Sequence, residues 1–226
     1  MGLNRSRGNM YSWPDMFGEY TDGVYTWNPI GGECKDHDCV YCYVKPQKRK
    51  PVLKEKYSGD HRLIEHELNT KLGSNRIIFV ESMSDLFADT VPEDAIARVL
   101  EHCNDYPDNM YLFQSKNPKR FNEFLKQFPP NYILGTTLET NEYYSDDISK
   151  APSLKERAEA LYGYCGCLRM VSVEPVLAFD PIPFARMILS TSPLFVSIGA
   201  DSQNCDLKEP SANDIKILVG LLRGKS

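Results

Sequence analysis

Long hydrophobic runs are missing from this 226-residue sequence, and so is an even set of cysteines. No apolar stretch approaches the roughly 20 residues that a helix needs to cross a bilayer, so we expect no membrane association. The first residues do not show the pattern of a secretory signal peptide, and seven cysteines do not suggest a disulfide framework. These absences lead us to expect reduced thiols and a cytoplasmic location.

A basic excess is also lacking, because the formal net charge is −5 at pH 7. This charge excludes a generic protein coat for nucleic acid, whose surface would be positive throughout. Hydrophobic residues make up 42% and charged residues 25% of the chain, a balance that indicates a globular protein rather than a disordered one. We expect a single domain over residues 1–226, in which residues 1–23 form an extended lead-in that packs across it.

Three of the cysteines, Cys34, Cys39 and Cys42, lie within nine residues in the spacing C-x4-C-x2-C. Two glycines shortly before the first cysteine give the loop room to turn, so the three thiolates can converge on one metal centre. Three thiolates on a four-iron cluster would leave one iron free to bind another molecule, and an open coordination position is typical of a catalytic metal site. We interpret the loop as the site of a [4Fe-4S] cluster.

Other interpretations of these cysteines remain open. A plant-type ferredoxin site would need a fourth thiolate, but the next cysteine, Cys103, falls on the apolar stripe of an expected helix. A zinc site could add His37, although His37 lies between two of the cysteines, where ligation by all of them would be cramped. A non-enzymatic iron–sulfur or zinc-binding module for electron transfer or sensing is therefore the alternative function. The pattern gives no role to Cys165, Cys167 or Cys205.

From residue 76 onward the sequence alternates between apolar runs and amphipathic segments. Buried strands are expected at residues 24–27, 76–80, 110–113, 132–135, 168–173 and 194–199. Amphipathic helices are expected between them and at 61–72, and Thr90, Ser153 and Ser211 each stand three residues before an acidic residue, as in a capping box. Six strand–helix units predict an α/β fold with a parallel sheet. Because eight units close a full barrel, we expect an open, partial (βα)6 barrel.

Polar residues follow every expected strand at its carboxyl end, which is where sites form in parallel α/β folds. Any one of them alone could be an ordinary cap or turn residue. Polar residues at six successive strand ends favour a site. After the second, fourth and fifth strands they include Glu81, Ser82, Ser84, Thr137, Glu139, Ser172 and Glu174.

A basic segment follows the cysteines, because residues 45–56 carry six basic residues and one acidic residue. This local charge is consistent with a solvated face, but it also suits an edge that binds phosphate beside the metal site. Lys48, Arg49 and Lys50 would contact the phosphate, together with Lys116 after the third strand. We therefore expect a phosphate-bearing small molecule or a nucleic acid as partner.

A cysteine triplet after the first strand of a six-unit βα chain resembles the radical S-adenosylmethionine superfamily. Cys34, Cys39 and Cys42 match its cluster motif, and Tyr43 matches the aromatic residue that commonly follows; the first gap has four residues, one more than is usual. A wider similarity joins the chain to a bacterial and phage-associated family within or beside that superfamily. The segments that carry it include Thr26-Trp27-Asn28-Pro29, Ser115-Lys116-Asn117-Pro118, Gly135-Thr136-Thr137-Leu138-Glu139 and Ile198-Gly199-Ala200-Asp201-Ser202.

The resemblance implies a radical enzyme whose open iron binds S-adenosylmethionine. One-electron reduction of that cofactor gives methionine and a 5′-deoxyadenosyl radical, which abstracts hydrogen from a substrate. An electron donor such as flavodoxin or ferredoxin would reduce the cluster. By position, the residues for the methionine amino group are Glu81, Ser82 and Ser84, those for the ribose are Thr137 and Glu139, and Ser172 and Glu174 lie beside them. The resemblance names neither a substrate nor a catalytic residue.

Overall fold

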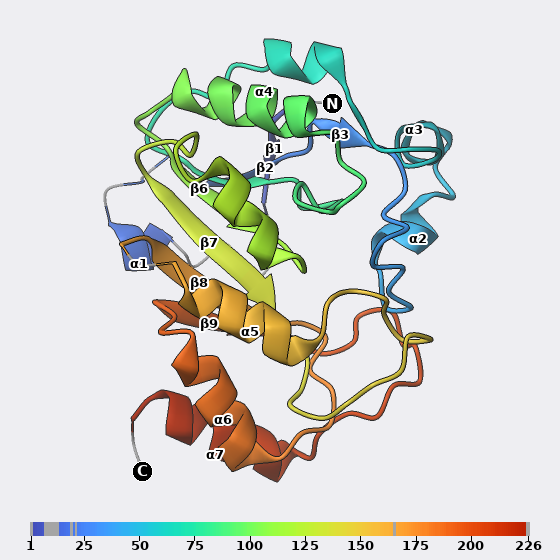
Figure 1. Ribbon diagram of the computed structural model, residues 1–226, viewed down its shortest axis with the longest axis vertical. Helices are drawn as coiled ribbons and strands as arrows, with labels where there is room; N and C mark the ends of the chain where they lie inside the picture. The colour runs from blue at the N-terminus through green and yellow to red at the C-terminus, as the bar shows by residue number, and fades with distance from the viewer. Residues whose placement is uncertain (1, 7–13, 19, 21, 165, 225–226) are drawn as a thin grey trace.

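Seven strands form one curled sheet in the computed structural model, which describes residues 2–6, 14–18, 20, 22–164 and 166–224 (Figure 1). The strand order is β1-β2-β5-β6-β7-β8-β9, and all neighbours from β2 to β9 are parallel. The sheet curls without closing, so the expected open, partial barrel is confirmed. The bounds are β1 (Asn4–Arg5), β2 (Val24–Trp27), β5 (Ile77–Val80), β6 (Met110–Gln114), β7 (Tyr132–Thr137), β8 (Leu168–Val173) and β9 (Phe195–Ile198).

Helices connect these strands, and Figure 1 shows α4, α5, α6 and α7 along the same side of the sheet. No helix in the described part of the chain is long and apolar enough to cross a membrane. The α-helices are α1 (Pro14–Phe17), α2 (Val44–Gln47), α3 (Pro51–Lys56), α4 (Glu93–Asn104), α5 (Leu154–Tyr162), α6 (Pro181–Ser190) and α7 (Ala212–Leu222). The described residues also form the 3-10 helices η2 (Glu65–Asn69) and η3 (Pro118–Phe124).

The main hydrophobic core lies between the sheet and these helices. Side chains alternate along β5, so that Ile78 and Val80 belong to this core, whereas Ile77 belongs to a smaller cluster on the other face. Cys103 of α4 is fully buried in the main core, which confirms the expectation from its place on an apolar stripe. Apolar packing therefore occupies the strand bodies and leaves their carboxyl ends for polar groups.

Some expected elements differ in the structure. Ser153 and Ser211 cap α5 and α7 in capping boxes as expected. The capping box expected at Thr90 is wrong, because Pro92 is the N-cap of α4. Thr90 instead donates hydrogen bonds to Asp36 of the cysteine loop, which is the segment 32–43 between β3 and α2. A tertiary partner thus replaces the local one.

The segment 61–72 is not the expected helix. It forms strand β4 (Arg62–Leu63), which pairs antiparallel with β3 (Ile30–Gly31), and then the 3-10 helix η2. Pairing with the strand before the cysteines overrides the local helical periodicity. The expected lead-in, residues 1–23, contains strand β1, which pairs antiparallel with β2. Residues 7–13 of the lead-in lie outside the described residues.

Candidate active site

A cavity of about 610 Å³ lies at the carboxyl ends of the parallel strands. Its wall includes residues of the cysteine loop and residues in or just after strands β5 to β9. Arg49, Lys50 and Glu139 are not part of this wall. The predicted site residues that line it are Cys34, Cys39, Cys42, Lys48, Glu81, Ser82, Ser84, Lys116, Thr137, Ser172 and Glu174.

Close packing of the backbone fixes the start of the cysteine loop. Gly32 has a φ of +108°, and a Cβ at this position would lie 2.5 Å from the carbonyl oxygen of Asp60. The next residue, Glu33, donates its backbone N–H to the carbonyl of Gly59 at 2.9 Å. A side chain at position 32 would separate these two segments, so the left-handed turn requires glycine.

The three thiols of the loop share one electrostatic environment. Cys39 is buried, whereas Cys34 and Cys42 are partly exposed. Burial raises the pKa of the Cys34 thiol, and the negative charges of Asp85, Cys39 and Cys42 raise it further. These effects disfavour the thiolate form of Cys34. A positively charged metal centre would offset them and stabilise the thiolates.

The described residues contain no group of three or more His, Cys, Asp or Glu side chains arranged to hold a metal ion. His37, the residue that a zinc site would add to the cysteines, has its Nδ1 3.3 Å from Asp85 Oδ2. A four-iron cluster is larger than a single ion and bonds each thiolate through a different iron, so its ligands stand further apart. Three thiols on one cavity wall are the donor set that a four-iron cluster with one open iron would take. Cys39 Sγ would exchange its 3.1 Å contact with Ser149 Oγ for iron.

Glu139, two residues after β7, is the centre of a buried network of charges. Its carboxylate binds Lys116 Nζ and Arg157 Nη1, and it accepts hydrogen bonds from the hydroxyls of Tyr41 and Tyr144. Burial opposes the charge, but Lys116 and Arg157 outweigh burial and lower the pKa of Glu139 to about 2. These partners occupy both carboxylate oxygens of a fully buried side chain. We therefore correct the expectation that Glu139 contacts a ribose: it supports the cysteine loop through Tyr41.

Glu81 follows β5 in a left-handed conformation, with a φ of +62°. Its Oε2 accepts a hydrogen bond from the backbone N–H of Ile30 at 2.8 Å. Within the described part of the chain, Glu81 Oε1 and the hydroxyl of Tyr57, both buried and both on residues of the cavity wall, have no hydrogen-bond partner. Burial raises the pKa of Glu81 to about 8. Unsatisfied buried polar atoms are costly, so this part of the wall is suited to a polar ligand.

Neighbouring side chains fix several other residues of the wall. Ser82 Oγ donates to Asn28 Oδ1 at 3.1 Å, and Glu174 Oε1 accepts a hydrogen bond of 2.5 Å from Ser197 Oγ. Thr137 Oγ1 accepts a hydrogen bond of 3.1 Å from a side-chain amide of β6. Because each contact leaves a further acceptor on the same residue, all three can still face a ligand. Their role in binding S-adenosylmethionine stays a prediction.

Two of the four basic residues expected to bind phosphate are neutralised by acidic partners. Lys48 Nζ lies 2.5 Å from Glu33 Oε1. Lys116 Nζ binds Glu139 and the hydroxyl of Tyr41, and its side chain is largely buried. Both residues line the cavity, but each would have to share its charge with an existing partner in order to hold phosphate.

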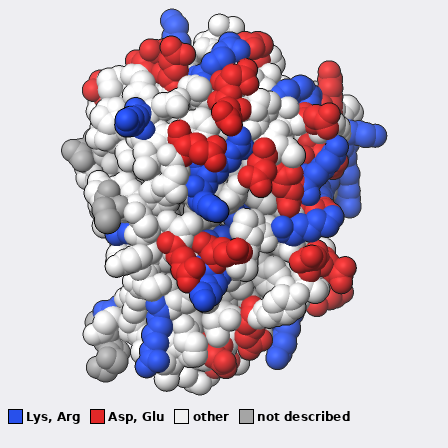
Figure 2. Space-filling model, viewed as in Figure 1, with Lys and Arg blue, Asp and Glu red and all other residues white. Residues whose placement is uncertain are grey.

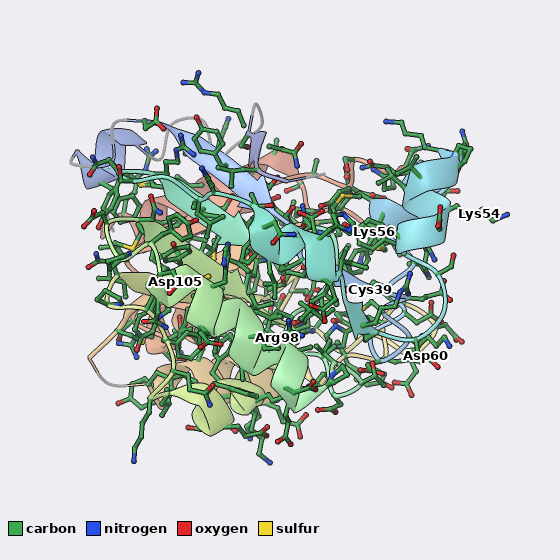
Figure 3. The ribbon with its side chains drawn as sticks, turned by 90° about the horizontal axis from the view of Figure 1, so that it is seen from above. Cys39, Lys54, Lys56, Asp60, Arg98 and Asp105 are labelled. Carbon is green, nitrogen blue, oxygen red and sulfur yellow. The ribbon has the colours of Figure 1, made fainter. Side chains whose placement is uncertain are left out.

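The other two basic residues lie outside the cavity. Arg49 and Lys50 are exposed, between α2 and α3. Figure 3 shows Lys54 of α3 pointing outward from the molecule, away from Cys39. On the face shown in Figure 2, basic and acidic side chains lie among one another and form no uniform positive field. The predicted phosphate edge is therefore divided between the cavity wall and an exposed surface beside it.

Sequence reasoning gave no role to four residues of the site: Tyr41, His61, Asp85 and Arg157. Tyr41 could have been found, because it lies between two cysteines and next to their expected metal. Asp85 accepts hydrogen bonds from Ser115 Oγ at 3.0 Å and from the following backbone N–H at 2.8 Å, and so joins the ends of β5 and β6. Arg157 and His61 carry no signal in the sequence, since their partners are distant along the chain.

The fold and the cavity define the chain as an α/β half-barrel protein with a thiol-lined cavity at the carboxyl ends of its strands. A family model matches residues 18–186, and the chain belongs to that family, which is described as "Protein of unknown function (DUF5131)". A search of curated proteins found no match.

Solved structures of spore photoproduct lyase are similar to this chain. A double mutant with bound AdoMet and dinucleoside spore photoproduct is 11% identical, with a TM-score of 0.52 over 88% of this chain and 61% of that chain. A single mutant is 11% identical, with a TM-score of 0.53, and another with dinucleoside spore photoproduct is 12% identical, with a TM-score of 0.52; each match covers 89% of this chain and 61% of the other. This chain therefore matches about three-fifths of the length of those proteins, and the likeness is one of fold.

Proposed function

We propose that this protein is a radical S-adenosylmethionine enzyme in which Cys34, Cys39 and Cys42 hold a [4Fe-4S] cluster. The observation that carries the proposal is that three thiols line one cavity at the carboxyl ends of a parallel half-barrel. The similar fold of a spore photoproduct lyase structure with bound AdoMet supports it. The cluster and S-adenosylmethionine together supply a 5′-deoxyadenosyl radical for hydrogen abstraction.

The chain's own residues would bind and orient the cofactor. Ser82, Ser84 and Glu81 lie where the methionine part is expected, and the unpaired Oε1 of Glu81 offers a polar atom there. Thr137 and Ser172 would contact the ribose in place of Glu139, because both line the cavity. Close packing of the loop and the strand ends would keep bulk water from the reacting atoms.

A nucleotide or a nucleic-acid base is the substrate class that we propose. The exposed basic residues Arg49 and Lys50, beside the cavity, and Lys48 on its wall support this class. The dinucleoside bound to a protein of similar fold is consistent with it. A flavodoxin or a ferredoxin would supply the electron.

Anaerobic reconstitution with iron and sulfide tests the proposal. We expect about four irons and four sulfides per chain, calorimetric binding of S-adenosylmethionine, and release of 5′-deoxyadenosine after reduction with dithionite. A bound cluster without any binding of S-adenosylmethionine would favour the alternative of an electron-transfer or sensor module. Purification with one zinc ion and no sulfide would exclude both iron–sulfur functions.

A further inference from the structure

Four side chains form a continuous chain of hydrogen bonds that ends at the cavity. Asp36 Oδ2 accepts hydrogen bonds from both the backbone N–H and the hydroxyl of Thr90, each at 2.8 Å. Thr90 Oγ1 lies 2.7 Å from Nδ1 of His61, and Nε2 of His61 lies 3.3 Å from Oγ of Ser84. Thr90 is exposed, His61 is buried and Ser84 lines the cavity. This row of hydrogen bonds therefore joins the protein surface to the cavity through a histidine.

The acceptor at the outer end fixes the direction of every bond in this chain. An aspartate carboxylate only accepts hydrogen bonds, so the Thr90 hydroxyl must be the donor in its hydrogen bond to Asp36. Thr90 Oγ1 can then only accept from His61, which places the ring proton on Nδ1. A neutral ring with Nδ1 protonated leaves Nε2 as an acceptor, so the hydroxyl of Ser84 donates to it.

The surroundings of His61 favour the neutral ring that this direction requires. Burial lowers the pKa of His61 from its ordinary value; His37 and Lys35 lower it further, whereas Asp36 and Asp85 oppose the shift. A buried neutral imidazole beside a hydroxyl can receive a proton, and the hydrogen bond at its other nitrogen then stabilises the charged ring.

We propose that Ser84 and His61 form a general acid–base pair that exchanges protons with a ligand in the cavity. The ligand group would be a hydroxyl or an amine whose proton passes to Ser84 Oγ as the proton of Ser84 passes to His61 Nε2. The ring then carries protons on both nitrogens, the ligand atom keeps its electron pair, and no electron is gained or lost overall. Thr90 and Asp36 hold the ring in position. This pair moves protons, so its action is separate from the proposed radical chemistry.

Ser82 provides a matched control two residues away. It also lines the cavity, but its hydroxyl donates to the amide oxygen of Asn28 at 3.1 Å, and an amide oxygen is not a base of comparable strength. Ser82 and Ser84 are two of the serines on this wall, and they differ in their partner: an amide oxygen for Ser82 and an imidazole for Ser84. The proposal requires that they differ in reactivity.

The ring tautomer is the first test. Long-range proton–nitrogen correlation spectra of protein labelled with ¹⁵N-histidine should show His61 with Nδ1 protonated and Nε2 bare, with the signal assigned by its loss in His61→Gln. Replacing Thr90 with valine, which has the same shape but accepts no hydrogen bond, should shift the ring toward the Nε2-protonated form. A wild-type ring protonated on Nε2 would overturn the proposal, because Ser84 could not donate to it.

Reactivity toward diisopropyl fluorophosphate is the second test. Ser84 Oγ should bond to phosphorus as the P–F bond breaks, with the hydroxyl proton passing to His61 and fluoride leaving. We expect labelling at Ser84 to be about a hundredfold slower in His61→Gln, as is common when a general base is lost, while Ser82 stays unlabelled. Thermal unfolding would check that each variant is folded.

Equal labelling of Ser82 and Ser84, or no effect of His61→Gln, would overturn the acid–base pair. Both tests are made on the purified full chain and need no S-adenosylmethionine. Their failure would therefore leave the proposed radical function standing, and failure of cluster assembly would leave the acid–base pair standing.

Discussion

The hydroxyl of Tyr41 donates a 2.5 Å hydrogen bond to Oε1 of Glu139, across 98 residues of sequence. Tyr41 lies between two cysteines of the C-x4-C-x2-C motif, and Glu139 is fully buried just after β7. Lys116 and Arg157 hold the carboxylate in place from two other elements. The cysteine loop is thereby attached to the strand ends by a charged group that cannot easily move, because an unpaired buried charge is costly.

Replacing Tyr41 with phenylalanine should loosen the cysteine loop. The change removes a hydrogen bond to a buried charge, and such bonds contribute about 1.5–3 kcal/mol to stability. We expect a loss of that size in urea unfolding, together with less iron retained per chain after reconstitution. Tyr144→Phe is the matched control, since Tyr144 also donates to Glu139 but lies outside the loop. Equal iron loss in the two variants would contradict a specific role for Tyr41.

Each of Cys34→Ser, Cys39→Ser and Cys42→Ser should abolish the cluster, as measured by iron and sulfide content. A hydroxyl replaces the thiolate that iron requires, while the size of the side chain is nearly kept. Cys103→Ser and Cys205→Ser are the controls, because Cys103 is buried in the core and Cys205 does not line the cavity. Loss of iron from Cys205→Ser would instead indicate a fourth thiolate and a closed cluster.

The pKa of Glu81 makes stability depend on pH. Burial raises it from 4.5 to about 8, so between these values the folded protein holds a proton that the unfolded chain has lost. This contribution is complete below about pH 4.5 and is lost as pH rises through about 8. The difference in unfolding free energy between pH 5 and pH 8.5 should be smaller in Glu81→Gln, by a few kcal/mol. An identical pH dependence in both proteins would show that Glu81 is not protonated in the fold.

Reversing the charges of Arg49 and Lys50 to glutamate should weaken binding of oligonucleotides, as measured by fluorescence anisotropy. Few phosphates would be contacted, so the salt dependence of the wild-type protein should be shallow. Lys126 and Lys155, exposed residues that do not line the cavity, give a control with the same change in net charge. Wild-type protein without salt-sensitive binding to DNA, RNA or nucleotides would exclude this surface as a phosphate site.

Periodicity and spacing determined the strands, the parallel half-barrel and the core position of Cys103. These features depend on residues close together in the sequence, where apolar alternation and helical stripes can be seen directly. The same local patterns indicated the thiol-bearing loop and the carboxyl ends where polar groups gather. They also led to errors: the helix expected at residues 61–72 and the cap expected at Thr90 both follow local rules that distant partners override.

Only the tertiary structure decided which polar residues face the cavity and which are bound within the protein. Glu139 was expected to contact a ligand, but Arg157 of α5 and Lys116, which lies between β6 and η3, neutralise it inside the wall. His61 gained a role because the fold places it between Thr90 and Ser84. Such contacts depend on the curl of the sheet and the register of its strands, and the hydrophobic pattern of one segment does not specify where another segment will lie.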